Sequence, residues 1–177
     1  HQANMHSTMM FFTEQGRLYW TKVYELPEGN RQSKGRALQN MINIQKGDKV
    51  CAFIHVKNLS DQEYVQNHYL IFATKNGLMK KTTLESYSRP RTNGIIALGL
   101  REDDRLIRVT LTDGKSQMLV ASYNGKVVRF PEDTVRPMGR TATGVRAIKL
   151  DEDGRDRVIG MICVEEGSKD SVLVISE

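Results

Sequence analysis

The feature that most constrains the fold of this chain is an internal repeat. Three basic loops, each broken by proline or glycine, end at a glycine and lead into an apolar segment. A second glycine stands upstream of each loop, giving pairs 19, 17 and 19 residues apart: Gly16 and Gly35, Gly77 and Gly94, Gly125 and Gly144. Repetition of this kind indicates stacked copies of one supersecondary unit that share a continuous core.

Each repeat is predicted to contain four short strands. Asn76-Gly77 and Asn124-Gly125 are strong signals for a tight hairpin turn, because both residue types tolerate positive φ. Apolar runs rich in branched and aromatic residues flank these turns and predict buried strands. The expected first strands are residues 9–13, 69–74 and 117–122. The expected second strands are residues 17–23, 78–84 and 126–130, and the expected third strands are residues 37–42, 95–100 and 145–150.

The fourth strand of each repeat alternates between apolar and polar residues. This period of two predicts one face toward the core. The residues expected on that face are Cys51, Phe53 and His55, then Ile107, Val109 and Leu111, then Ile159, Met161 and Cys163. His55 is therefore expected to be a hydrogen-bonded core histidine rather than a metal ligand.

The repeats together predict an all-β chain. Four strands in units of about 45 residues are typical of a propeller-like disc of four-stranded blades. The repeats cover about 7–56, 69–112 and 117–164, and a fourth unit begins at 171–177, so we expect about three blades plus one strand. All four prolines fall in expected loops, since proline is excluded from central strands.

Charge is separated by position within the repeat. The windows 16–36, 77–94 and 125–146 hold 14 of the 26 Lys and Arg but only 5 of the 21 Asp and Glu. Such a bias should give a basic face, as expected of a nucleic-acid-binding protein, although three solvated loops without a ligand are the alternative. The predicted DNA-binding residues are Arg31, Lys34, Arg36, Lys80, Lys81, Arg89, Arg91, Arg129, Arg136, Arg140 and Arg146.

One position in the second strand is occupied by Trp20, Lys81 and Arg129 in the three repeats. Two of these residues are basic, so we expect this position to face solvent or a ligand. For Trp20, a stacking surface and ordinary packing under a neighbour are both open, and packing is favoured.

No catalytic or cofactor-binding pattern is recognisable. The histidines lack zinc-ligand spacing, no phosphate-binding Gly-Lys-Ser/Thr loop occurs, and the acidic turn Glu102–Asp104 is at most a weak cation site. Cys51 and Cys163 are expected to be free thiols in a reducing cytoplasm. No run reaches the ~18 apolar residues of a membrane helix. The chain starts at His1 without an initiator methionine, so we expect a piece of a larger protein.

Three long motifs resemble a known family. The segments Lys22–Pro27, Ser88–Leu98 and Arg136–Arg146 are similar, in the same order, to the C-terminal domain of the bacterial DNA gyrase A subunit. The resemblance begins near Met9 and covers nearly the whole of the remaining chain. Within the same class of enzyme, the equivalent domain of topoisomerase IV is an alternative. A protein-binding propeller of the WD40 or kelch type is another, although the Trp-Asp and Gly-His signatures of WD40 are absent.

The resemblance implies a β-pinwheel, a disc of four-stranded blades with strands exchanged between neighbours, around whose basic perimeter duplex DNA wraps. It further implies a non-catalytic module of a cytoplasmic, nucleoid-associated enzyme. In that holoenzyme the partners are the gyrase B subunit together with a second copy of the gyrase A protein. Mg²⁺ and ATP are the cofactors of negative supercoiling there, and neither is expected to bind this segment. The chain departs from the family in blade number and in lacking the basic Gln-Arg-Arg-Gly-Gly-Lys-Gly box, which Asn30–Arg36 matches only in composition.

Overall fold

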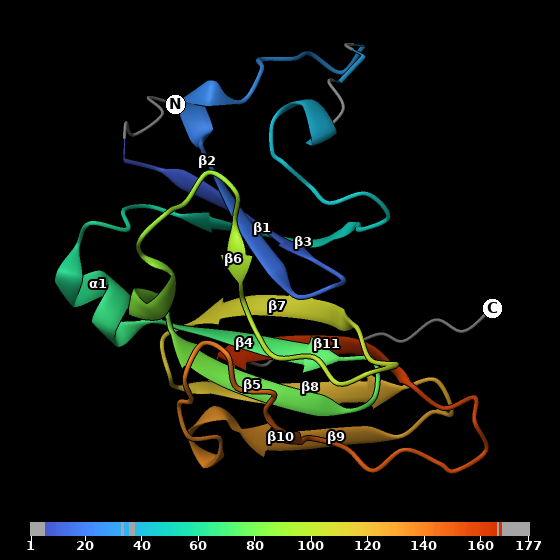
Figure 1. Ribbon diagram of the computed structural model, residues 1–177. Helices are drawn as coiled ribbons and strands as arrows, with labels where there is room; N and C mark the ends of the chain where they lie inside the picture. Colours follow the sequence, from blue (N-terminus) through green and yellow to red (C-terminus); the bar gives the residue numbers. More distant parts are fainter. Residues whose placement is uncertain (1–5, 33, 36–37, 166, 168–177) are drawn as a thin grey trace.

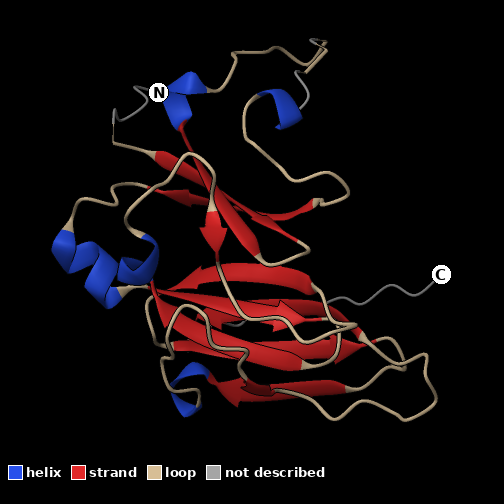
Figure 2. Ribbon diagram, viewed as in Figure 1, coloured by secondary structure: helices blue, strands red, loops and turns tan. Residues whose placement is uncertain are grey.

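The computed structural model describes residues 6–32, 34–35, 38–165 and 167, and it consists mainly of β-strands with a few short helices (Figures 1 and 2). The strands are β1 (Thr8–Thr13), β2 (Arg17–Lys22), β3 (Val50–Val56), β4 (Tyr69–Thr74), β5 (Leu78–Thr83), β6 (Ile95–Ile96), β7 (Leu106–Thr112), β8 (Ser116–Ser122), β9 (Val127–Pro131), β10 (Val145–Arg146) and β11 (Val158–Glu165). The helical segments are α1 (Gln62–Asn67) and the 3₁₀ turns η1 (Val23–Glu25), η2 (Leu38–Asn40), η3 (Leu84–Tyr87) and η4 (Glu132–Thr134). The all-β prediction is confirmed.

The strands form three antiparallel sheets stacked face to face (Figure 1). We call them blade one (order β3-β1-β2-β6), blade two (β10-β5-β4-β7) and blade three (β11-β8-β9). The fourth strands β3, β7 and β11 lie against one another at the inner side of the stack, so β6 and β10 lie at its outer edge.

Strands are exchanged between consecutive repeats. β6 belongs to the second repeat in sequence but pairs with β2 of the first, with Ile95 opposite Leu18. β10 belongs to the third repeat and pairs with β5 of the second, with Val145 opposite Met79. Each of the first two blades is therefore completed by the repeat that follows it, as the resemblance to a pinwheel implies.

Four of the six recurring glycines lie where an exchanged segment crosses the neighbouring blade, namely Gly16, Gly77, Gly94 and Gly144. Gly77 in the β4–β5 hairpin has φ 91°, and its carbonyl accepts a hydrogen bond from the Ala147 N–H at 2.8 Å. Gly144 has φ 104°, and a Cβ there would lie 2.3 Å from the Met79 carbonyl oxygen. Only glycine permits both this conformation and this approach. In the second repeat, the spacing of Gly77 and Gly94 thus reflects the distance along the chain between a hairpin turn and a crossing.

The core consists of one apolar layer between each pair of blades. The layer between blades one and two contains Phe12 and Phe72, whose rings meet edge to face 5.6 Å apart. The layer between blades two and three contains Ile71 and Met118. Successive side chains of β4 thus enter different layers, since a strand points them to opposite faces. Blade two is consequently covered on both faces.

The fourth-strand prediction is right for two of the three residues in the second and third repeats, and only for Cys51 in the first. Val109, Leu111, Met161 and Cys163 pack into the layers between blades, each on the side facing the preceding blade. The equivalent side chains in β3 are exposed: Phe53 is 60% exposed, and His55 is not a core histidine. The physical reason is that no preceding blade covers this side of β3 in the described part of the chain.

A register shift also interrupts the simple alternation in each fourth strand. Phe12 pairs with Ala52 and the next residue, Thr13, with Val50, so Cys51 is an additional, unpaired residue. Ile107 and Ile159 are skipped in the same way in β7 and β11. Such bulges bend a strand and rotate its side chains, which explains why Ile159 is exposed rather than on the core face.

The third-strand predictions are too long in two repeats and wrong in the first. Only Ile95–Ile96 and Val145–Arg146 form ladders, after which Ala97 and Ile148 turn into the core. In the first repeat the described part of the predicted strand forms η2, and Ile42 packs on Phe11 and Tyr19 of its own blade. A third strand needs the second strand of a preceding blade as its partner, and the described chain offers none to this repeat.

The connection between the first two repeats contains the short helix α1, which the sequence did not predict. Asp61 caps it by accepting a hydrogen bond from the Tyr64 N–H, and Val65 is buried. No helix in the described ranges is long and apolar enough to cross a membrane. The predicted start of a fourth unit at 171–177 lies outside the described residues.

Candidate nucleic-acid interface

Two exchanged loops carry basic side chains to the outer edge of the stack. The loop 88–94 of the second repeat crosses β2 of blade one, where Arg17 donates a side-chain hydrogen bond to the Asn93 carbonyl at 2.9 Å. The loop 136–144 of the third repeat crosses β5 of blade two, where the Met138 N–H bonds to the Lys81 carbonyl at 2.7 Å. Strand exchange therefore gives each of these two blades the basic loop of the following repeat.

Most of the predicted basic residues are accessible. Arg89 and Arg91 are exposed at the edge of blade one, and Arg136 and Arg146 are exposed at the edge of blade two. Arg140 is half-buried, and its guanidinium donates a hydrogen bond to the Ile96 carbonyl, which joins the two exchanged segments.

The remaining surface residues of the prediction lie apart from these loops. Arg31 and Lys34 are exposed in the long loop between β2 and β3, and Arg129 is exposed on β9 of blade three. Arg36 lies outside the described residues. Each exposed guanidinium or ammonium is available to a polyanion, although only the exchanged loops group them beside a shared edge.

Lys80 does not contribute to a basic surface, because it is fully buried. Its ammonium donates hydrogen bonds to the Tyr87 hydroxyl at 3.2 Å, the Ala97 carbonyl at 2.6 Å and the Arg140 carbonyl at 2.5 Å. It also lies 4.7 Å from the centroid of the Phe72 ring. Burial, reinforced by the charge of Arg140, lowers the pKa of Lys80 to about 7. Lys80 thus ties the exchanged strand of its own repeat to the loop of the next one.

Lys81 is also buried, so the expectation that this position faces solvent is wrong there. Its ammonium lies 3.5 Å from Oε1 of Glu132, a fully buried carboxylate of blade three, and 4.4 Å from the centroid of the Tyr69 ring. Glu132 also accepts hydrogen bonds from the Thr112 hydroxyl and the Ser116 N–H. A buried charge needs such partners, and here they join blades two and three.

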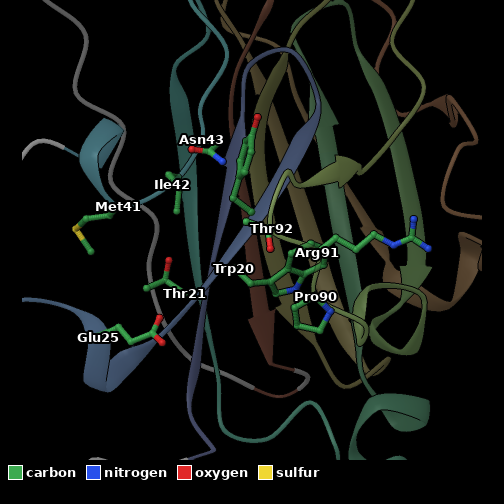
Figure 3. Close-up of a pocket in the computed structure, with 10 residues that line it drawn as sticks. Trp20, Thr21, Glu25, Met41, Ile42, Asn43, Pro90, Arg91 and Thr92 are labelled. Carbon is green, nitrogen blue, oxygen red and sulfur yellow. The ribbon is translucent and has the colours of Figure 1, made fainter.

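The first-repeat residue at the same position, Trp20, packs as predicted. Its side chain is half-buried against the layer between blades one and two, and its indole N–H donates to the Tyr87 carbonyl at 3.1 Å. It lines an open cleft of about 360 Å³ together with Ile42, Pro90 and Arg91. Figure 3 shows the Arg91 guanidinium extending away from Ile42 and Asn43. The cleft is therefore bounded by the exchanged loop, while the charge of Arg91 lies beyond it.

A repeated aspartate, which was not predicted from the sequence, fixes the turns. The carboxylates of Asp48, Asp104 and Asp156 accept hydrogen bonds from the N–H groups of Gln15, Asn76 and Asn124 in the respective hairpins. The signal was present as Asp-Lys or Asp-Arg directly before each fourth strand. These contacts hold each hairpin turn to its own fourth strand. In blades two and three the beginning of that strand also hydrogen-bonds to the preceding blade, through the Leu106 and Val158 N–H groups.

The acidic turns form no candidate metal centre. Asp151 pairs with Lys126 and accepts a hydrogen bond from Asn124, and these contacts lower the pKa of Asp151. Within the residues described, no group of three or more His, Cys, Asp or Glu side chains is arranged to hold a metal ion.

Comparison with known proteins identifies the repeats. The family model described as "DNA gyrase C-terminal domain, beta-propeller" matches residues 7–57, 68–113 and 117–165. The DNA gyrase A protein of Haemophilus influenzae is 46% identical over 148 residues, covering 84% of this chain and 16% of that protein. Its Staphylococcus aureus counterpart is 43% identical over 172 residues, covering 97% and 19%. The chain thus spans less than a fifth of the curated relatives it matches.

Solved structures agree in fold. The C-terminal domain of DNA topoisomerase IV superposes with a TM-score of 0.79 at 27% identity, over 92% of this chain and 48% of that one. A DNA gyrase A C-terminal domain superposes with a TM-score of 0.72 at 21% identity, over 92% and 50%. Because the family model matches all three repeats, the chain belongs to the DNA gyrase C-terminal domain family of β-propellers.

Proposed function

We propose that this chain is a non-catalytic DNA-wrapping module of a type II topoisomerase, binding duplex DNA along the outer edge of its blades. The observation that carries the proposal is the pair of exchanged loops, which lay exposed arginines beside the edges of two consecutive blades. The DNA gyrase relatives support the same assignment, since they are named for an enzyme that acts on DNA.

The chemistry of the edge favours contacts with phosphates. Arginine guanidinium groups bind phosphate oxygens through charge-assisted hydrogen bonds. Contacts of this kind position a duplex without reading its sequence. With Lys80 and Lys81 buried, the candidates for phosphate contact on the exchanged loops are Arg89, Arg91, Arg136, Arg140 and Arg146. We therefore expect binding with little sequence preference.

Wrapping adds a mechanical demand. Smooth bending of 20–30 base pairs costs on the order of several kcal/mol, which only a continuous row of phosphate contacts can offset. The two described exchanged loops supply part of such a row, so we expect this chain alone to bind weakly and to wrap poorly.

The role in the whole enzyme forms part of the proposal. We infer that the domain presents wrapped DNA to a cytoplasmic, nucleoid-associated holoenzyme containing the gyrase B subunit together with a second copy of the gyrase A protein. The holoenzyme then uses Mg²⁺ and ATP for negative supercoiling. The curated relatives at 43–46% identity are gyrase A proteins, which favours gyrase. The two solved domains do not favour gyrase, since the topoisomerase IV domain is 27% identical and the gyrase A domain 21%.

The test is a salt titration of duplex binding. Each phosphate contact contributes about −0.9 to the slope of log affinity against log salt, so about five contacts predict a slope near −4 to −5. The double variant Arg89→Ala/Arg91→Ala should bind more weakly and have a slope about 1.8 units flatter by the same rule.

The control variant Lys57→Ala/Lys115→Ala removes the same charge from exposed connections between repeats, away from the exchanged loops. It should retain the wild-type slope. Equal slopes for the wild type and the Arg89/Arg91 variant would place the contacts elsewhere and contradict the proposal.

A further inference from the structure

A second cleft, lined by basic residues, lies where blades two and three meet, at the end of the stack that carries the hairpin turns. Its volume is about 500 Å³, and its lining includes Lys75 and Asn76 from the β4–β5 turn, Tyr123 from the β8–β9 turn, and Arg155 and Arg157 from the loop before β11. None of the loops proposed to hold duplex DNA contributes to it.

Two backbone hydrogen bonds hold this cleft, the first between blades two and three and the second within blade three. The Val158 N–H donates to the Lys75 carbonyl at 2.8 Å, and the Tyr123 N–H donates to the Arg157 carbonyl at 2.8 Å. The cations of the cleft are therefore carried by backbone that is fixed from both blades.

The three cations of the cleft lack an anionic partner within the described part of the protein. Neither of the two ion pairs among the described residues includes Lys75, Arg155 or Arg157. The carboxylate in the lining, Asp156, accepts hydrogen bonds from the N–H groups of Asn124, Asp151 and Arg157, so its oxygens face the backbone. Three positive charges converging on one cleft create a site for an anion.

An aromatic ring accompanies these charges. The Arg157 guanidinium lies 4.1 Å from the centroid of the Tyr123 ring, a distance typical of a cation–π contact. Tyr123 nevertheless remains 56% exposed. A planar group can therefore stack on the accessible part of the ring while a phosphate attached to it approaches the cations.

We propose that this cleft binds a nucleotide, with its phosphate at Lys75, Arg155 and Arg157 and its base against Tyr123. Single-stranded nucleic acids are commonly bound by this combination of basic groove and stacking aromatic residue. A free nucleotide and one nucleotide of an unpaired strand share the required chemistry. A base inside a duplex does not, because its faces are already stacked.

The other junction between blades explains why the site occurs once in the described chain. At the junction of blades one and two, Glu14 occupies the position that Lys75 has in the cleft. The Glu14 carbonyl accepts a hydrogen bond from the Leu106 N–H, just as the Lys75 carbonyl accepts one from the Val158 N–H. Lys75 in turn occupies the position of Tyr123, and Arg105 that of Arg157. This junction therefore carries a carboxylate and lacks the aromatic ring, so it does not favour a nucleotide.

The experiment measures binding of fluorescein-labelled hexathymidylate to the whole chain by anisotropy. Tyr123→Ala should weaken binding about tenfold, within the range for one base stacked on one aromatic side chain. Lys75→Glu makes this junction resemble the other one and should weaken binding by more than about tenfold, because a repulsive charge replaces a charge-assisted contact. Arg155→Ala, at an exposed side chain, provides a variant with little effect on folding.

Two controls test whether the charge must lie at this site. Arg105→Ala removes the equivalent cation from the other junction, and Lys57→Ala/Lys115→Ala removes charge from the exposed connections between repeats; both should bind the hexamer like the wild type. Competition by thymidine monophosphate but not by thymidine would indicate a site for a single nucleotide, and competition by neither would indicate a strand.

Unchanged hexamer binding by Tyr123→Ala and Arg155→Ala, in chains whose thermal unfolding matches the wild type, would overturn the proposal. Loss of hexamer binding in the Arg89/Arg91 variant alone would likewise assign the strand to the outer edge. The duplex titration described above does not depend on either result.

Discussion

Replacing Gly144 with alanine should disrupt the exchange of β10 onto blade two. Gly144 has φ 104°, and an added Cβ would lie 2.3 Å from the Met79 carbonyl oxygen and 2.8 Å from its carbon. Both atoms belong to the backbone of β5, so no side-chain rotation relieves the contact. β10 would have to move away from β5, weakening the pairing of Val145 with Met79 and the bond from the Ala147 N–H to the Gly77 carbonyl.

The expected loss of stability has two parts. A left-handed backbone costs a residue with a Cβ about 1–2 kcal/mol. Two or three weakened hydrogen bonds at about 0.5–1.5 kcal/mol each add about 2–3 kcal/mol. We therefore expect Gly144→Ala to lower the free energy of unfolding by about 3–5 kcal/mol, measured by urea denaturation of the whole chain followed by circular dichroism.

Gly125→Ala is the matched control. Gly125 has φ 87°, similar to Gly144, but an added Cβ there meets nothing within 4 Å. It should therefore lose only the backbone part, about 1–2 kcal/mol. Equal losses for the two variants would show that β10 does not approach β5 closely, and the strand exchange as described would be wrong.

Three further predictions concern the buried polar groups and the thiols. Lys80→Met should lower the free energy of unfolding by about 2–4 kcal/mol in urea denaturation, because the Ala97 and Arg140 carbonyls lose their donor inside the core; a loss below about 0.5 kcal/mol would refute this role. Because burial lowers the pKa of Lys80 to about 7 from its ordinary 10.5, the unfolded chain binds more protons between pH 7 and 9. Wild-type stability should therefore rise with pH in that window, while Lys80→Met should show a flatter profile, and parallel profiles would count against the buried amine. Cys51 and Cys163 lie in different blades, so thiol titration after denaturation without reductant should find two free thiols, and a disulfide would contradict this. Because burial raises the pKa of the Cys51 thiol to about 12, alkylation of Cys51 in the folded chain should be slow.

The sequence by itself determined the features that depend on neighbouring residues along the chain. The first and second strands of every repeat were predicted to within one or two residues, because hairpin turns and runs of branched residues are local signals. The glycine pairs and the position of the basic loops followed from the repeat alone. Surface positions such as Arg89, Arg91 and Arg136 were found because charged residues beside proline and glycine are typical of exposed loops.

The tertiary structure alone decided which blade each third strand completes and which charges are buried. Nothing local distinguishes a strand that pairs within its repeat from one that pairs with the preceding repeat. The sequence therefore did not show that the first repeat has no such partner among the described residues. Lys80 and Lys81 are adjacent and must point to opposite faces of β5, and in an isolated sheet one of them would reach water. Both are buried because blades one and three cover the two faces of blade two, and their oxygen partners are supplied by Ala97, Arg140 and Glu132. The environment of a side chain in a stacked repeat depends on residues of the neighbouring blades, and these residues reach it only when the blades assemble.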